Sequence, residues 1–189
     1  MSGTRQRRVP IKRSPPPEAP LQESDGLRPE GEGWFVVNLA EAQAIALEGA
    51  GHAWTFEDPA RRFPHFGINV HVLQPGEPAS KYHAEEAQEA FLVLQGECLL
   101  IVEDEERRLR QWDFFHAAPW TPHVLLGAGT GPSAILMVGS RFAGKGIIYP
   151  VSETAARYGA SVETETSSPQ EAYAGWKLPK PGRRPWPPD

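Results

Sequence analysis

This sequence lacks the cysteine pairs of disulfides, the long apolar runs of membrane spans and the excess of basic residues of nucleic-acid-binding surfaces. It holds a single cysteine, Cys98, so no disulfide can form within the chain, and the apolar run around Cys98 indicates a small buried side chain in a reducing compartment. No apolar run approaches the roughly 20 residues that cross a bilayer. The formal net charge is -5, which argues against nucleic acid as the main partner, because phosphate contacts rely on clustered Lys and Arg. The start has no apolar segment of the secretory type, so we expect a cytoplasmic protein that binds neither nucleic acid nor membranes.

Proline, by contrast, is abundant, and many of the 20 prolines crowd the two ends of the chain. Segments of this composition lack the apolar content that would offset the entropy of ordering. We therefore expect a flexible Pro/Arg-rich tail over residues 1–33, one domain over 34–150, and a short helical and Pro-rich extension over 151–189. The early basic residues are too few to predict a site for an acidic partner or RNA, and a solvated tail is the expected role.

The middle of the chain has the pattern of a strand protein. Short apolar runs alternate with turn signals such as Pro75-Gly76 and Gln95-Gly96, with no helical pattern between them. Strands at such regular spacing predict an antiparallel sandwich or barrel. The expected strands are Gly67–Leu73, Ser80–Glu85, Ala90–Leu94, Cys98–Val102, Arg107–Gln111, Asp113–Ala117, His123–Leu126 and Ser133–Gly139.

Helical signals occur only outside this block. Asn38 with Glu41 three residues later forms a plausible capping box and predicts a helix over Leu39–Leu47. A second helix is expected over Ser152–Tyr158, and Ser168 followed by proline predicts the start of a third. The sequence thus predicts an all-β core with a few short flanking helices.

The side chains best suited to chemistry lie near the middle of this block. Residues two apart on a strand share a face, so His83 and Glu85 point the same way. Glu89 opens the next expected strand, and His123 opens another after a loop. Two imidazoles with one or two carboxylates suit a divalent ion: Mn, Fe, Ni, Co or Zn. Two carboxylates side by side are costly to bury without a cation. This cost favours metal binding over the alternative, in which these side chains line the barrel opening and form hydrogen bonds only with one another and with water.

This stretch resembles the first motif of the cupin superfamily, G-x5-H-x-H-x3,4-E-x6-G. Pro75-Gly76 opens the motif, and the run from Glu89 to Gly96 matches its E-x6-G half. His83 fits the first histidine position if the preceding gap is one residue longer, and Glu85 then occupies the second. The alternative alignment places Tyr82 and Ala84 at these two positions and loses the ligands.

The second motif, G-x5-P-x-G-x2-H-x3-N, matches at fewer positions. Trp112 and Trp120 stand where glycines are usual, His123 keeps the histidine position, and Gly127 replaces the closing asparagine. Glycine often supplies positive φ in such turns. Tryptophan adopts positive φ less readily, so the usual conformation of this loop does not follow from the motif. The resemblance implies a cupin-type antiparallel β-barrel, also described as a double-stranded β-helix or jelly roll, of the single-domain uncharacterised kind, with metal ligands His83, Glu85, Glu89 and His123.

Several alternatives stay open at this point. Glu85 is a metal ligand, or a catalytic residue that moves a proton, or a solvent-facing side chain. His71 and His116 lie in apolar strands, where a histidine is more often a core or rim residue than a ligand. The chain is a metal-dependent enzyme of the dioxygenase, isomerase or decarboxylase type acting on a small molecule, or a non-catalytic module that binds or senses one. Because cupins commonly pair through sheet edges, we also expect a homodimer.

Overall fold

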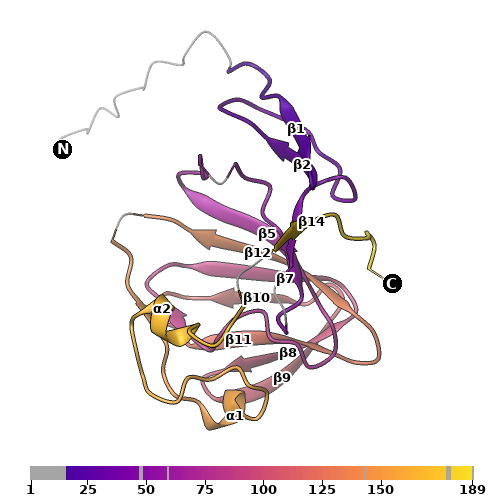
Figure 1. Cartoon of the computed structure of the whole chain (residues 1–189). Coiled ribbons are helices and arrows are strands. Elements are labelled where there is room, and N and C mark those ends of the chain that lie inside the picture. The colour runs from indigo at the N-terminus through magenta and orange to yellow at the C-terminus, as the bar shows by residue number, and fades with distance from the viewer. Residues whose placement is uncertain (1–15, 47–48, 59, 143, 178–179, 189) are drawn as a thin grey trace, which may run out of the picture.

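The structure is a computed structural model, which describes residues 16–46, 49–58, 60–142, 144–177 and 180–188 (Figure 1). The first half of the expected tail, residues 1–15, lies outside the described residues. The strands are β1 Leu21–Ser24, β2 Gly26–Pro29, β3 Ala44–Ala46, β4 His52–Trp54, β5 Phe66–Leu73, β6 Ala84–Glu85, β7 Glu89–Gln95, β8 Glu97–Val102, β9 Glu105–Arg110, β10 Phe114–Ala117, β11 His123–Ala128, β12 Ser133–Ser140, β13 Ile147–Ile148 and β14 Lys180–Gly182.

Antiparallel sheets make up the molecule, as the strand pattern predicts. A seven-stranded sheet has the order β10-β7-β12-β5-β4-β3-β14, and a three-stranded sheet has the order β11-β8-β9. Two further two-stranded pairs are β1-β2 and β13-β6. The all-β prediction is therefore confirmed, and the arrangement is consistent with a jelly roll. Within the described residues the strands form separate sheets and not one closed barrel.

The main core lies between the inner faces of the two large sheets. Alternate side chains of β7 and β8, such as Phe91, Val93, Cys98 and Leu100, point into it, and Ile135 of β12 is fully buried there. Alternation arises because successive side chains of a strand point to opposite faces. Burial of each such side chain stabilises the fold by about 1.5–3 kcal/mol. This core fixes the positions of β7 and β11, which carry two of the candidate site residues.

The outer face of the three-stranded sheet is covered by the segment that follows β13. Ile101, Val124 and Leu126 pack there against Ala155 of α1 (Glu153–Ala156). The N-cap of α1 is Ser152, and that of α2 (Pro169–Ala172) is Ser168. The two helices predicted from Ser152 and from Ser168 are thus present, with α1 ending at Ala156 instead of Tyr158 (Figure 1). None of the helices in the described ranges is long and apolar enough to cross a bilayer.

The predicted helix over Leu39–Leu47 is wrong for residues 39–46, and Leu47 lies outside the described residues. Asn38 does cap a turn, since its side chain accepts a hydrogen bond from the Ala40 amide at 2.9 Å. The chain then continues into β3, because Ala42 and Ala44 are buried against Trp54 on the outer face of the large sheet. Burial at every second residue is a strand pattern, and it outweighs the local capping signal.

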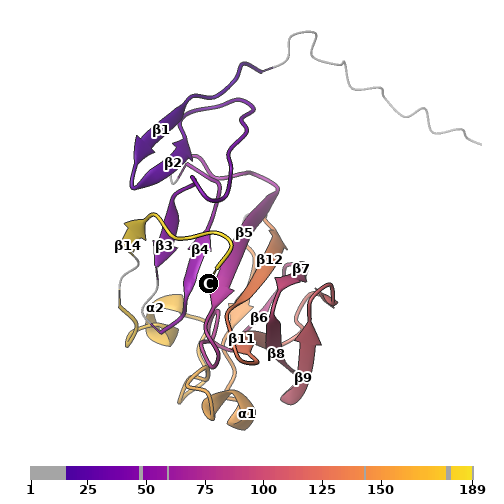
Figure 2. The ribbon, with the colours of Figure 1, turned by 90° about the vertical axis from the view of Figure 1, so that its right-hand side faces the viewer.

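The two ends of the chain are more ordered than their composition predicts. Residues 21–29 form the β1-β2 hairpin, which lies at the opposite end of the molecule from α1 in both ribbon views (Figures 1 and 2). Near the other end, β14 pairs with β3, and Trp186 packs edge-on against Trp54 with 5.6 Å between ring centroids. The expected domain boundaries at 33/34 and 150/151 stay predictions.

Candidate metal centre

Two histidines from different β-segments are joined directly through their backbones. The amide of His83 donates to the carbonyl of His123 at 3.1 Å, and the amide of His123 donates to the carbonyl of His83 at 2.9 Å. This reciprocal pair is an antiparallel bridge, in which opposed side chains lie on the same face. The two imidazole centroids are accordingly only 5.1 Å apart. The sequence-based expectation that the two rings meet in one place is met by the geometry.

Hydrogen bonds fix the tautomer of both rings. Nδ1 of His83 lies 2.7 Å from the carbonyl oxygen of Lys81, and Nδ1 of His123 lies 2.9 Å from that of Thr121. A carbonyl oxygen only accepts, so each Nδ1 carries the proton and each Nε2 keeps its lone pair. Burial lowers the pKa of His83, and it lowers that of His123 to about 4, with repulsion from His83 as the second cause. Both rings are therefore neutral at pH 7, the form in which imidazole binds a metal.

Glu89 supplies a carboxylate to the same place. It opens β7, and its Oε2 lies 3.6 Å from Nε2 of His123. Burial, followed by repulsion from Glu85, raises the pKa of Glu89 to about 7. A neutral ring beside it offers no compensating charge, and 3.6 Å is too long for a hydrogen bond. The ammonium group of Lys145, which is paired with Glu85, lowers the pKa of Glu89 but does not offset these two effects.

The three side chains fit a metal ion. Among the described residues, His83, Glu89 and His123 form a group whose ligand atoms all lie within 4.8 Å of one another. Two ligand atoms of a tetrahedral zinc site, each about 2.1 Å from the ion, lie ~3.4 Å apart, close to the separation observed between His123 and Glu89. The second nitrogen of each ring is already held by a backbone carbonyl, as is usual for metal-bound histidine.

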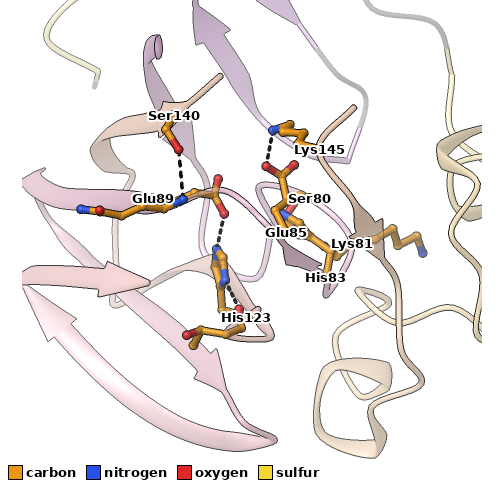
Figure 3. A network of polar contacts seen from close by, with 10 residues as sticks. Ser80, Lys81, His83, Glu85, Glu89, His123, Ser140 and Lys145 are labelled. Atoms are coloured by element: carbon orange, nitrogen blue, oxygen red, sulfur yellow. Dashed lines mark hydrogen bonds and ion pairs between the residues drawn. The ribbon is translucent and has the colours of Figure 1, made fainter. Parts of the chain in front are cut away.

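Glu85 stands apart from this group. Its carboxylate forms an ion pair with the ammonium group of Lys145, which lies in the loop after β12. Figure 3 shows the two carboxylates turned in different directions, Glu85 toward Lys145 and Glu89 toward His123. The sequence reasoning missed Lys145, because a lone lysine in a loop gives no pattern that points to a cavity.

The two tryptophans that replace the usual glycines of the second motif keep a glycine-like backbone conformation. Trp112 has φ 75° and Trp120 has φ 66°, both in the left-handed region. That conformation costs an ordinary residue about 1–2 kcal/mol. The amide of Trp120 donates to the carbonyl of Glu85 at 2.6 Å, and its ring lies against Gly146. The strained turn therefore holds both segments that carry the Glu85–Lys145 pair.

A cavity of about 230 Å³ opens beside the three grouped residues. Glu85 and Lys145 also line it, as do Asn69 and His71 from β5. His71 thus reaches the cavity, whereas His116 is exposed, and neither it nor His52 or His65 is among the lining residues. Asn69 was missed, although its position two residues before His71 predicts that both side chains share a face.

The polar atoms of this β5 wall are poorly satisfied. Oδ1 of Asn69 and Nδ1 of His71 are buried and have no hydrogen-bond partner within the described part of the chain. A buried polar atom without a partner costs about 1–3 kcal/mol. Burial lowers the pKa of His71 to about 4, with repulsion from His52 as the second cause, so this ring is also neutral at pH 7.

Comparison with known proteins identifies the class to which this β-protein belongs. Residues 69–139 match the family model described as Cupin domain. The matched segment is a cupin domain, and it contains Glu89 and His123 as well as the β5 wall. No curated protein matches the chain.

Several solved structures are similar to parts of the chain. A putative sugar phosphate isomerase from Acidithiobacillus ferrooxidans is 27% identical over 46% of this chain and 56% of its own length, with a TM-score of 0.43. The polyketide cyclase RemF from Streptomyces resistomycificus is 14% identical over 56% of this chain and 78% of its own, with a TM-score of 0.48. The DMSP lyase DddQ from Ruegeria pomeroyi is 17% identical over 50% and 49%, with a TM-score of 0.42. The chain thus spans about half the length of the first and third of these proteins.

The depressed pKa of His71 predicts how stability depends on pH. The unfolded chain binds a proton at this side chain near pH 6.5, but the folded chain does so only near pH 4. Lowering the pH from 6.5 to 4 therefore favours unfolding, by up to about 3 kcal/mol for this residue. Urea unfolding of the metal-free protein at pH 7, 5 and 4 should show a shallower loss of stability in His71→Leu than in wild type. An exposed loop histidine serves as control: His65→Leu should keep the wild-type slope. Equal slopes in His71→Leu and wild type would contradict the assignment.

Proposed function

We propose that this chain is a metal-dependent enzyme that acts on a small organic molecule, with the ion held by His83, Glu89 and His123. The observation that carries the proposal is the convergence of two neutral Nε2 atoms and one buried carboxylate at the edge of a cavity. The raised pKa of Glu89 supports it, since a bound cation would stabilise the ionised carboxylate.

The donor set favours a divalent transition metal. Two imidazoles with one carboxylate suit Fe(II) as well as Mn, Co, Ni and Zn, whereas Ca²⁺ and Mg²⁺ prefer oxygen ligands. When bound, such an ion supplies a Lewis-acid or redox centre with open coordination positions, as dioxygenase, isomerase or decarboxylase chemistry requires.

The surrounding residues prepare the site for that chemistry. Phe91 and Phe115 meet the ring of His123 edge-on, at centroid distances of 5.1 and 5.5 Å, and keep water from that side of the imidazole. Glu85 lines the cavity without belonging to the grouped ligands, so we assign it the role of moving a proton to or from the bound molecule. Its predicted role as a fourth ligand would require release from Lys145.

Metal analysis of protein purified without chelator tests the proposal. Wild type should retain close to one equivalent of metal, and Glu89→Gln should lose it, because the amide carries no charge and binds metal weakly. We expect the affinity to fall at least 100-fold, by comparison with the roughly 10–100-fold lost when only an outer partner of a ligand is removed.

Glu86→Gln is the matched control, since Glu86 is an exposed neighbour of Glu85 outside the cavity lining. It should retain the metal. Metal binding by Glu89→Gln equal to that of wild type would refute the proposal. Metal retained by wild type without turnover of any small molecule would instead identify a non-catalytic binding or sensing module.

We further propose that the protein is a cytoplasmic homodimer. Cys98 is buried and unpaired, which suits a reducing compartment. β10 is an edge strand, paired only with β7 among the described strands, and Phe114 on it is 63% exposed. Phe114 lies beside Leu92 of β7, which lies beside Leu136 of β12. This apolar row ends at an open edge that a second copy could cover.

Light scattering tests the dimer. Wild type should have twice the mass of one chain, and Phe114→Asp should shift the population to monomer by burying a charge at the edge. Val151→Asp, which changes an exposed apolar residue elsewhere, should remain dimeric. A monomeric mass for wild type would refute the pairing.

A further inference from the structure

The cavity has a second polar wall, which is uncharged and separate from the candidate metal centre. It consists of Asn69 and His71, which project from the inner face of β5. In the sheet register Asn69 lies beside Met137 of β12, and Met137 lies beside Phe91 of β7. The wall is therefore two strands away from the strand that carries Glu89, about 10 Å between backbones.

Two glycines line the cavity close to Glu89. In the neighbouring row of the sheet, Gly67 of β5 and Gly139 of β12 lead to Glu89 of β7. A side chain built at Gly67 would collide with the guanidinium group of Arg141, at 2.8 Å from its first carbon. The side chain of Arg141 thus takes the space beside Gly67, and the side chain of Glu89 is the nearest group to Gly139.

The β5 wall offers hydrogen bonds without charge. Asn69 is uncharged, and His71 is neutral at pH 7 because burial lowers its pKa to about 4. An amide and a neutral imidazole each present a donor and an acceptor, which matches hydroxyl or carbonyl groups. The two cations that line the cavity are already paired, Arg141 with Glu57 and Lys145 with Glu85.

Apolar side chains separate the wall from the metal centre. Phe91, Leu125 and Met137 also line the cavity, and Met137 lies between Asn69 and Phe91 in the sheet register. The volume of about 230 Å³ is below the roughly 300–1,000 Å³ of sites that take drug-sized ligands. The cavity therefore suits a short carbon chain with polar groups at both ends.

We propose that the cavity binds a small polyhydroxylated acid, whose chelating head reaches the His83–Glu89–His123 centre and whose uncharged hydroxyl groups hydrogen-bond to Asn69 and His71. This assignment of substrate class rests on the proposed metal function. Both side chains line the cavity, on the same face of β5 where the next residue, Leu73, is a core residue.

Two probes that share a chelating head test the inference. L-threonate carries hydroxyl groups along its chain, and 2-hydroxybutanoate has the same head and chain length without them. Calorimetry on the zinc-loaded protein should show threonate binding about tenfold more tightly, because only it satisfies the wall. In the double variant Asn69→Leu/His71→Leu the preference should vanish, while zinc affinity and binding of 2-hydroxybutanoate remain.

A stability measurement distinguishes a ligand-binding wall from a structural one. The double variant removes unsatisfied polar atoms, so in the metal-free state its Tm should equal or exceed that of wild type. Ile135→Ala is the control, since Ile135 is buried and lies opposite His71 in the register, and it should lower Tm by roughly 5–15 °C. A lower Tm in the double variant would show that the wall serves the fold and would overturn the inference.

The remaining outcomes separate the two proposals. Zinc binding with equal affinity for both probes, or a preference that persists in the double variant, overturns the substrate class and leaves the metal centre intact. Absence of zinc binding in wild type overturns both.

Discussion

The reciprocal backbone bridge between His83 and His123 is the interaction on which the candidate site depends. It brings together two segments about 40 residues apart in the chain, and in doing so places two imidazoles side by side. The Nδ1–H group of each ring then donates a hydrogen bond to the carbonyl oxygen two residues earlier in the sequence. These backbone contacts thus direct both Nε2 atoms toward the same place.

Burial is the second constraint, and it acts on charge. It keeps the two rings neutral and raises the pKa of Glu89. A buried carboxylate beside neutral imidazoles is a poor arrangement for stability but a good one for a cation. The wall of Asn69 and His71 follows the same logic, since it holds two of the buried polar atoms that have no hydrogen-bond partner in the described part of the chain. Stability is given up at both walls of one cavity, which is typical of a functional site.

Much of this could be predicted from the sequence, because the informative patterns were local. Alternating apolar residues marked β5 and β7 to β12, and Ser168 followed by proline marked the start of α2. The positions of His83, Glu89 and His123 were predicted from spacing and from the cupin motif. The helix over Leu39–Leu47 was wrong because a correct capping signal at Asn38 was outweighed by tertiary burial of Ala42 and Ala44. Lys145, which engages Glu85, had no local signature at all, since only the loop after β12 brings it to the cavity.

The most direct test of the metal centre is anomalous diffraction at the zinc edge from crystals grown with zinc. We expect one strong peak inside the cavity, which marks a zinc ion bonded to Nε2 of His83, Nε2 of His123 and a carboxylate oxygen of Glu89, at about 2.0–2.2 Å from each. A peak bonded to Nδ1 of either ring, or zinc bound only at surface carboxylates with the cavity empty, would contradict it.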